Sequence, residues 1–487
     1  MSENGNKVDD GLLPEEKVEA DVETPPSPTP PTAHVDEKLD SFDPPPFDKP
    51  VRVTYADIFK QFVLLGWTAF GGPAAHIALF QKIFVERLHW MKMGIFTELL
   101  ALGQCLPGPT STQMSFAIGV TKKGIPGGLL SGILFQYPGL IMMTLFGAGA
   151  ATYLDRPPAW LSALANGFGA VGVALVAGAA VGLLTKLCAT KTLGVLAGIS
   201  AVFAYYYPTA YMFPVLIVFG GAVSWFVRRK EPVLVDAEKE ELDREVESLG
   251  LGRVGGAVLI LIWICTLVGT IVARSLTSYS NHAMLPLHWF EAFFRIGSII
   301  FGGGQVVLPM IMDEVVQCEG GTGAGVSTTC VETATSWVTS EQFLAGLGLV
   351  QAMPGPLFNL SAYLGAVMAI RAGYSFIVGT AVCWVGLFGP GLLLIYGVLP
   401  YWGKFRKLPV YRRALPGLNA SAVGLVVAAV FSLFNRVLTA STMTFPNAAV
   451  CIMIIAYVVV ERLNCPPPIM VLVGGGLGVF AWAVKMN

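Results

Sequence analysis

Four polar residues directly follow the sequence Pro107-Gly108-Pro109 in an otherwise apolar stretch, and they are Thr110, Ser111, Thr112 and Gln113. Proline and glycine interrupt a helix, so the helix that restarts here has free backbone N–H groups at its N-terminus. Such an end attracts anions, and the neighbouring hydroxyl and amide donors suit a tetrahedral oxyanion. The alternative is that these residues only cap the helix. Their position directly after the break favours anion binding.

A glycine-rich break lies upstream of this one, and both breaks occur again in the second half of the chain. Trp90 precedes Pro107 by the same number of positions as Trp337 precedes Pro354, which supports a true duplication. Unpaired backbone is tolerated in a membrane only where it lines a cavity or is buried in protein. We therefore predict that the breaks form a binding site, with further contacts from Gly71, Gly72, Pro73, Gly108, Gly302, Gly303, Gly304, Gln305, Gly355 and Asn359.

Two ionisable residues lie close to the glycine-rich breaks, and each has two interpretations. His76 follows Gly72 by four positions. It either carries a proton in coupled transport or is a hydrogen-bonded interior histidine. Arg295 precedes the second glycine-rich break and either balances the charge of a dianion or pairs with Glu291 one helical turn earlier.

The composition is that of an integral membrane protein. The chain has 487 residues, of which 54% are hydrophobic and 13% are charged, and its mean hydropathy is +0.64. Soluble domains are about 25% charged. Long apolar runs recur along the chain, which favours helices over a barrel. No nucleotide-binding, CxxC or Cys/His metal-binding spacing is present, so we expect no cofactor and no metal, and nothing suggests a nucleic-acid partner.

The chain divides into four parts. We expect a disordered, acidic, proline-rich tail over residues 1–50, a transport repeat over 51–227, a charged linker with a linking transmembrane helix over 228–286, and a second transport repeat over 287–487. Each repeat is predicted to contain two broken helical hairpins and about four spanning helices. The hairpins either re-enter on one side of the membrane or span it.

The charges of the loops favour re-entrant hairpins and a cytoplasmic N-terminus, because basic loops then share one side. The linking helix inverts the second repeat relative to the first. This all-helical topology also places Cys318 and Cys330 outside, where we predict a disulfide between them.

The break motifs together resemble those of the chromate ion transporter family, in its long two-domain form. The resemblance rests on Phe70-Gly71-Gly72-Pro73-Ala74-Ala75-His76-Ile77, Leu106-Pro107-Gly108-Pro109-Thr110-Ser111-Thr112-Gln113, Phe301-Gly302-Gly303-Gly304 and Pro354-Gly355-Pro356-Leu357-Phe358, and it covers roughly residues 51–487. It implies membrane transport of chromate, with sulfate as a related oxyanion. The long tail, Met353 and the long 313–339 loop depart from the bacterial pattern and suggest a eukaryotic member.

These observations favour a multi-pass secondary transporter of the plasma membrane, which binds its oxyanion at the midplane and works by alternating access. The alternatives are a passive anion channel and a membrane sensor with a signalling tail. An intramembrane enzyme needs paired acids, Ser/Lys pairs or His clusters inside the bilayer, and no suitable spacing is present. A homodimer is the default expectation for the assembly.

Overall fold

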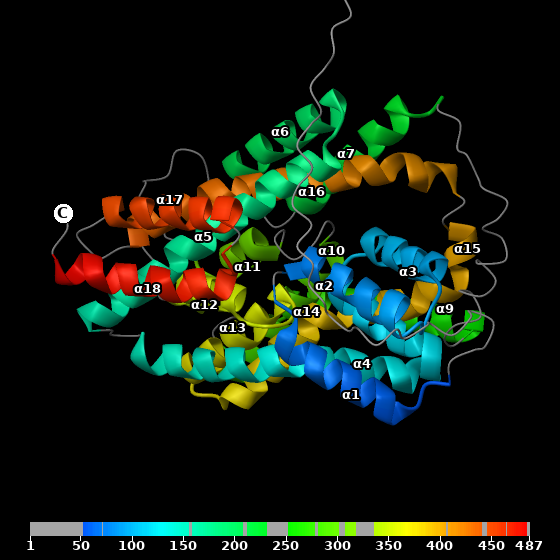
Figure 1. The fold of residues 1–487 in the computed structure, drawn as a ribbon, viewed down its shortest axis with the longest axis horizontal. Helices are drawn as coiled ribbons and strands as arrows, with labels where there is room; N and C mark the ends of the chain where they lie inside the picture. Colours follow the sequence, from blue (N-terminus) through cyan, green and yellow to red (C-terminus); the bar gives the residue numbers. More distant parts are fainter. Residues whose placement is uncertain are drawn as a thin grey trace, which may run out of the picture. The chain divides into compact units, whose positions relative to one another are not determined.

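The computed structural model describes residues 52–70, 72–154, 158–207, 212–230, 252–277, 281–300, 307–317, 336–405, 408–440, 446–463 and 465–484. All regular secondary structure in these ranges is helical (Figure 1). Five helices, α4, α5, α9, α14 and α16, are long and apolar enough to cross a membrane. The prediction of an all-helical membrane protein is confirmed. The predicted tail lies outside the described residues.

The helices of the first half follow the predicted order. They are α1 (Tyr55–Thr68), α2 (Gly72–Phe80) with a π-helical continuation (Gln81–Arg87), α3 (Met93–Cys105), α4 (Thr110–Tyr153), α5 (Ala159–Leu187), α6 (Lys191–Tyr206) and α7 (Met212–Val227). Helix α4 is two helices that meet at a kink, where Gly124 has a φ of +61°. The two arms of α4 run antiparallel, because the Ser131 hydroxyl donates to the Ser115 carbonyl at 2.7 Å.

The second half repeats this order after α9 (Gly252–Ser275). It contains α10 (Leu285–Ile299), α11 (Val307–Val315), α12 (Ser340–Ala352), a 3-10 turn (Leu357–Asn359), α13 (Leu360–Arg371), α14 (Phe376–Val398), a second 3-10 turn (Leu399–Tyr401), α15 (Trp402–Phe405), α16 (Pro409–Ala440), α17 (Pro446–Leu463) and α18 (Pro467–Ala483). Helices α1 and α12 each begin with a capping box, formed by Thr54 with Asp57 and by Thr339 with Gln342.

The chain doubles back at the predicted interruptions. The ring of Phe62 in α1 stacks on that of Phe84, with 4.9 Å between the ring centroids. One continuous helix would separate these residues by roughly 30 Å. Across the second Pro-Gly-Pro, the Tyr363 hydroxyl donates to the Gln342 carbonyl at 2.7 Å. Helices α10 and α11, which flank the second glycine-rich break, are joined by an ion pair between Arg295 and Glu314.

A long helix of each half packs against helices of the other half. Helix α5 packs against α17 and α18, whereas α16 packs against α6 and α7. Glycines permit these contacts: a Cβ on Gly167 in α5 would overlap the Gly474 carbonyl in α18, and a Cβ on Gly417 in α16 would overlap the Gly220 carbonyl in α7. These helix crossings form a scaffold to which both halves contribute, as small residues at helix interfaces permit in membranes.

Replacing Gly417 by alanine tests this scaffold. The new methyl group overlaps the backbone of α7, so α7 and α16 must separate. We expect the free energy of unfolding to fall by about 1–3 kcal/mol. Thermal unfolding of the purified protein measures the change. The control is Gly198→Ala in α6, where the added Cβ meets nothing within 4 Å. An equal loss in both variants would contradict close α7–α16 packing as the cause.

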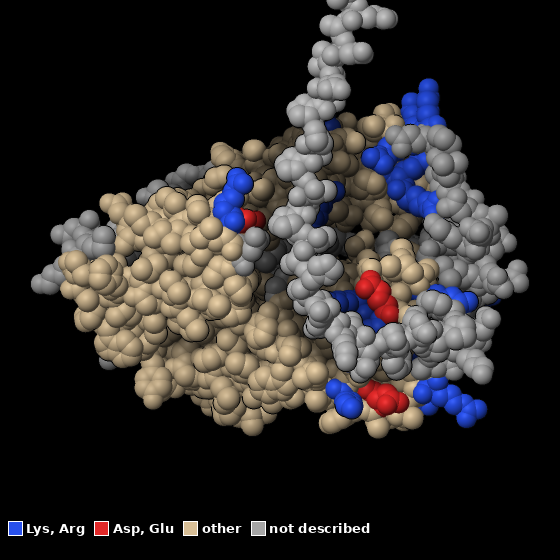
Figure 2. Space-filling model, in the orientation of Figure 1, with Lys and Arg blue, Asp and Glu red and all other residues tan. Residues whose placement is uncertain are grey.

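Charged side chains are distributed unevenly over the visible face. In Figure 2 the visible Lys and Arg side chains gather mainly on the right-hand half, and the left-hand half is almost entirely uncharged. Helices α9 and α15 lie at the right-hand end in Figure 1. Arg253 lies near the start of α9, and Lys404 lies in α15. Basic residues at one end of a set of apolar helices are typical of proteins inserted in a membrane with a fixed orientation.

Candidate anion-binding site

The tips of the interrupted helices meet through two reciprocal hydrogen bonds. The Gly108 N–H donates to the Ile300 carbonyl at 2.9 Å, and the Gly355 N–H donates to the Ala69 carbonyl at 2.9 Å. Each donor is the central residue of a Pro-Gly-Pro, and each acceptor immediately precedes a Phe-Gly-Gly of the other half. Each Pro-Gly-Pro therefore lies against the residue that precedes the glycine-rich break of the other half, and convergence of all four breaks stays a prediction.

Glycine is required at the tip of the first Pro-Gly-Pro. Gly108 has a φ of +121°, a conformation that side chains rarely adopt, and an added Cβ would lie 2.9 Å from the Gly391 Cα in α14. Gly355 and Gly72 also have positive φ values, of +92° and +76°. Pro73 follows in the first turn of α2, where a proline needs no hydrogen-bond acceptor.

The four polar residues after the first Pro-Gly-Pro are all buried at the start of α4. The Thr110 hydroxyl contacts the Gly103 carbonyl at 3.3 Å. The Gln113 amide donates to the Pro107 carbonyl at 2.9 Å and to the Gly391 carbonyl at 3.2 Å. The hydroxyls of Ser111 and Thr112 and the Oε1 atom of Gln113 have no hydrogen-bond partner among the described residues.

The backbone at this helix end also presents donors. The first hydrogen bond of α4 runs from the Gln113 N–H to the Pro109 carbonyl, so the N–H groups of Thr110, Ser111 and Thr112 have no acceptor within the helix. Pro109, at the N-cap, provides no side-chain cap. Among the described residues, this helix end therefore combines N–H groups that have no acceptor within the helix with two buried hydroxyls that have no partner.

At the corresponding end in the second half, the polar side chains have partners within the protein. The Asn359 amide contacts the Gln136 carbonyl at 3.5 Å, and its oxygen accepts from the Trp384 indole N–H at 3.1 Å. The Ser361 hydroxyl donates to the Phe358 carbonyl at 2.8 Å. The duplicated sequence suggests two equivalent ends, whereas Ser111 and Thr112 lack side-chain partners among the described residues and Asn359 and Ser361 have them.

His76 and Gln136 add buried polar groups next to the first-half tips. The His76 Nε2 atom lies 3.0 Å from the Ala69 carbonyl, and the His76 ring meets that of Phe135 edge-on. His76 Nδ1 and Gln136 Oε1 have no partner in the described structure. The antiparallel register of the α4 arms places Gln136 within about one helical turn of the level of Thr112.

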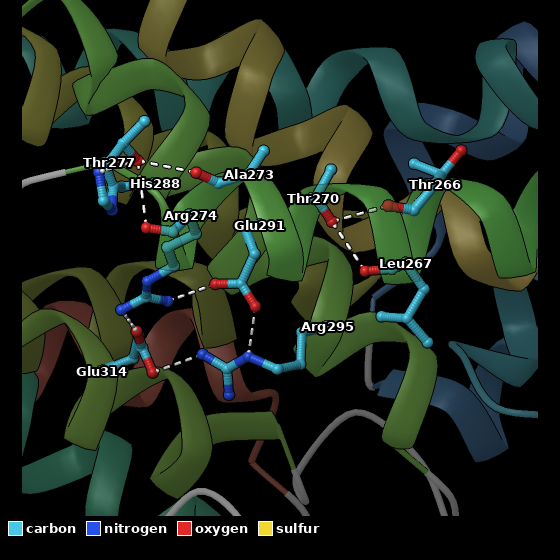
Figure 3. Close-up of polar contacts among 10 residues, drawn as sticks. All are labelled: Thr266, Leu267, Thr270, Ala273, Arg274, Thr277, His288, Glu291, Arg295 and Glu314. Carbon is cyan, nitrogen blue, oxygen red and sulfur yellow. Dashed lines mark hydrogen bonds and ion pairs between the residues drawn. The ribbon is translucent and has the colours of Figure 1, made fainter.

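Arg295 lies in a closed network of four charged side chains (Figure 3). Its Nε donates to Glu291 at 2.6 Å and its Nη2 to Glu314 at 2.9 Å. Arg274 in α9 pairs with the same two carboxylates. Of the two interpretations for Arg295, pairing with Glu291 is therefore present in this structure, and a role in balancing a dianion stays a prediction.

Several predicted residues lie outside the described ranges, and their predicted roles stay predictions. They are Gly71, Gly302, Gly303, Gly304 and Gln305 among the binding residues, and the candidate disulfide partners Cys318 and Cys330.

Sequence reasoning missed Gln136, Trp384, Arg274 and Glu314. The sequence could have marked Gln136 as a candidate, because an isolated amide in a long apolar run is energetically costly in a membrane.

These features define a polytopic α-helical membrane protein with interrupted helices and a buried polar cluster at the start of α4. The sequence profile of the family described as chromate transporter matches residues 56–225 and 287–479. The chain is 24% identical over 439 residues to a probable chromate transport protein of Synechococcus elongatus, covering 87% of this chain and 95% of that protein.

Two further relatives are named chromate transport protein. The one from Pseudomonas aeruginosa is 25% identical, with 79% of this chain and 82% of the relative covered. The one from Cupriavidus metallidurans is 23% identical, with 87% and 92% covered. No solved structure matches the chain. The chain belongs to the chromate transporter family, in its long-chain form.

Proposed function

We propose that this chain is a secondary transporter of chromate and of sulfate-like tetrahedral oxyanions, which bind at the N-terminus of α4. The observation that carries this proposal is the pair of buried hydroxyls of Ser111 and Thr112, 1% exposed each and without partners among the described residues. A buried hydroxyl that makes no hydrogen bond costs about 1–3 kcal/mol. A bound oxyanion relieves that cost because its oxygens accept from both hydroxyls and from the free N–H groups.

The names of the relatives support chromate as a substrate, since two of them are named chromate transport protein and a third is named probable chromate transport protein. Chromate and sulfate are both tetrahedral dianions, and hydroxyl and N–H donors respond to shape and charge rather than to the central atom. The same helix end therefore accepts both anions. Nothing in this donor set requires a metal ion or a cofactor.

We propose that the two halves are inverted repeats with re-entrant hairpins. Hairpin tips that meet near the midplane would account for the way in which the two halves pack. The reciprocal bonds from Gly108 and Gly355, together with the exchanged partners of α5 and α16, are the relations expected of halves related by a twofold axis. Inverted repeats of this kind place substrate at the repeat interface. With the basic helix ends on the cytoplasmic side, the N-terminus is cytoplasmic too.

Alternating access accounts for a difference between the matching hairpin arms. Helix α12 packs along α5 and α18, whereas the corresponding α3 has its main contacts with α4 and the π-helical segment. Gln104 in α3 is exposed, while Gln351 at the matching position of α12 is half-buried. We infer that the site opens beside α3 in this conformation. In the opposite conformation α3 packs on the scaffold and α12 separates from it.

Flux measurements in proteoliposomes test the proposal. The full chain should accumulate radiolabelled sulfate and chromate, each in competition with the other, under an imposed pH or voltage gradient. Currents far above carrier turnover would instead indicate a passive channel. Deleting residues 1–50 distinguishes a transporter from a membrane sensor with a signalling tail, because a transporter keeps its flux without the tail. Absence of flux for both anions would contradict the proposed function.

Proton coupling makes His76 the residue to test. The His76 Nε2 atom lies against the Ala69 carbonyl, and its Nδ1 atom has no partner among the described residues, so the ring can gain a proton without breaking its existing contact. We expect His76→Gln to retain uptake driven by the anion gradient and to lose the response to an imposed pH gradient. Gln136→Leu, which removes a neighbouring amide that does not titrate, should keep the pH response. A normal pH response in His76→Gln would assign His76 to a structural role.

A further inference from the structure

The network around Arg295 resembles an anion-binding site in which a side-chain carboxylate takes the place of the anion. Three helices contribute to it: Arg274 comes from α9, Glu291 and Arg295 from α10, and Glu314 from α11 (Figure 3). The Glu314 carboxylate accepts from the Nη2 atoms of both arginines, each at 2.9 Å. Two guanidinium groups that converge on one carboxylate form the arrangement that proteins use to bind oxyanions.

The two carboxylates of the network differ in burial. Glu291 is 2% exposed and holds both arginines from the α10 side. Glu314 is 13% exposed, and the arginine side chains are 18–20% exposed, so this side of the network is accessible from outside the protein core. Glu291 thus fixes the positions of the guanidinium groups, and Glu314 is the partner that can leave.

The charges suit a doubly negative ligand. The four side chains are neutral as a set, with two positive and two negative charges. When Glu314 leaves, two guanidinium groups remain opposite the single charge of Glu291, and the vacated position carries excess positive charge. A tetrahedral dianion has oxygens that can accept from both guanidinium groups, as the two oxygens of Glu314 do.

We propose that Arg274 and Arg295 form a second oxyanion site and that the Glu314 carboxylate occupies it as a built-in competitor. This inference rests on the proposed transport of oxyanions, and the site is separate from the start of α4. A chromate or sulfate ion displaces Glu314 as it passes this side of the protein, and Glu314 returns when the anion leaves. No covalent change is involved, and only ion pairs are exchanged.

Neutralising the competitor tests the proposal directly. In Glu314→Gln the amide no longer attracts the arginines, so the KM for sulfate uptake should fall by about threefold or more at low ionic strength. Glu314→Asp keeps the charge and should remain near the wild-type KM. Arg295→Lys keeps the positive charge but loses the bidentate N–H donors of the guanidinium group, and its KM should rise.

Thermal unfolding with sodium sulfate provides a second measurement that does not depend on transport. Sodium chloride at equal ionic strength is the control. The full-length Glu314→Gln protein should have a lower midpoint than wild type without sulfate and a larger sulfate-induced rise. Arg274→Lys and Arg295→Lys should reduce that rise.

The outcomes separate this inference from the proposed function. If Glu314→Gln leaves the KM unchanged or raises it as Arg295→Lys does, the network is structural and the second site is wrong. If the wild-type chain transports neither anion while sulfate still stabilises it in a Glu314-dependent way, the second site stands and the transport function falls. If transport depends on Ser111 and Thr112 but no Glu314 variant changes it, only the second site is overturned.

Discussion

Replacing Gly108 by alanine is expected to abolish oxyanion uptake and to lower the free energy of unfolding by about 2–5 kcal/mol. Two costs add. The φ of +121° is unfavourable for any residue with a Cβ, and the added methyl group would lie 2.9 Å from the backbone of α14 at Gly391. Relief of that overlap moves the tip, which breaks the hydrogen bond to the Ile300 carbonyl and displaces the start of α4.

Gly373→Ala is the matched control for this variant. Gly373 also has a positive φ, of +76°, but an added Cβ meets nothing within 4 Å. The backbone cost alone is about 1 kcal/mol. We expect this control to unfold slightly earlier than wild type and to transport normally. Thermal unfolding and sulfate uptake measure both variants, and equal losses in the two would show that backbone strain, rather than the contact between the tip and α14, dominates.

The sequence allowed the interruptions of the helices to be predicted because proline and glycine act locally. Pro107-Gly108-Pro109 and Pro354-Gly355-Pro356 each place two prolines around a glycine, and α3 and α12 end just before them. Which tip faces which is a tertiary relation. The bond from Gly108 to Ile300 joins two segments of different halves, and no local pattern encodes that pairing.

The duplication also concealed a difference between the halves. From the sequence, Thr112 and Asn359 are equivalent candidates after a Pro-Gly-Pro. In the structure the Trp384 indole N–H donates to Asn359, whereas the Thr112 hydroxyl has no partner among the described residues. Trp384 lies in another helix, so only the packing of α14 on the tip shows which donors remain for a ligand. Similarly, Glu314 reaches Arg295 across the glycine-rich break, a contact that helical periodicity does not predict.

Removing the two hydroxyls at the start of α4 should weaken anion binding without lowering the stability of the protein. In the double variant Ser111→Ala with Thr112→Val, the shapes are nearly kept and the hydrogen bonds to the anion are lost. A hydrogen bond to a charged group contributes about 1.5–3 kcal/mol, so the KM should rise by about 100-fold or more. Because neither hydroxyl has a partner in the described structure, its removal relieves an unpaired buried group, and the unfolding midpoint should stay the same or rise.

Ser115→Ala one turn further along α4 gives the opposite pattern and is the control. Its hydroxyl is buried and already donates to the Thr112 carbonyl at 2.7 Å, so its loss should cost about 1 kcal/mol of stability and leave the KM unchanged. Sulfate uptake and thermal unfolding of the same preparations distinguish the two patterns. If the double variant loses stability and keeps its KM, Ser111 and Thr112 support the helix rather than the anion. Natural proteins rarely keep unpaired buried hydroxyls without a function, which is why we propose the start of α4 as the place where the anion binds.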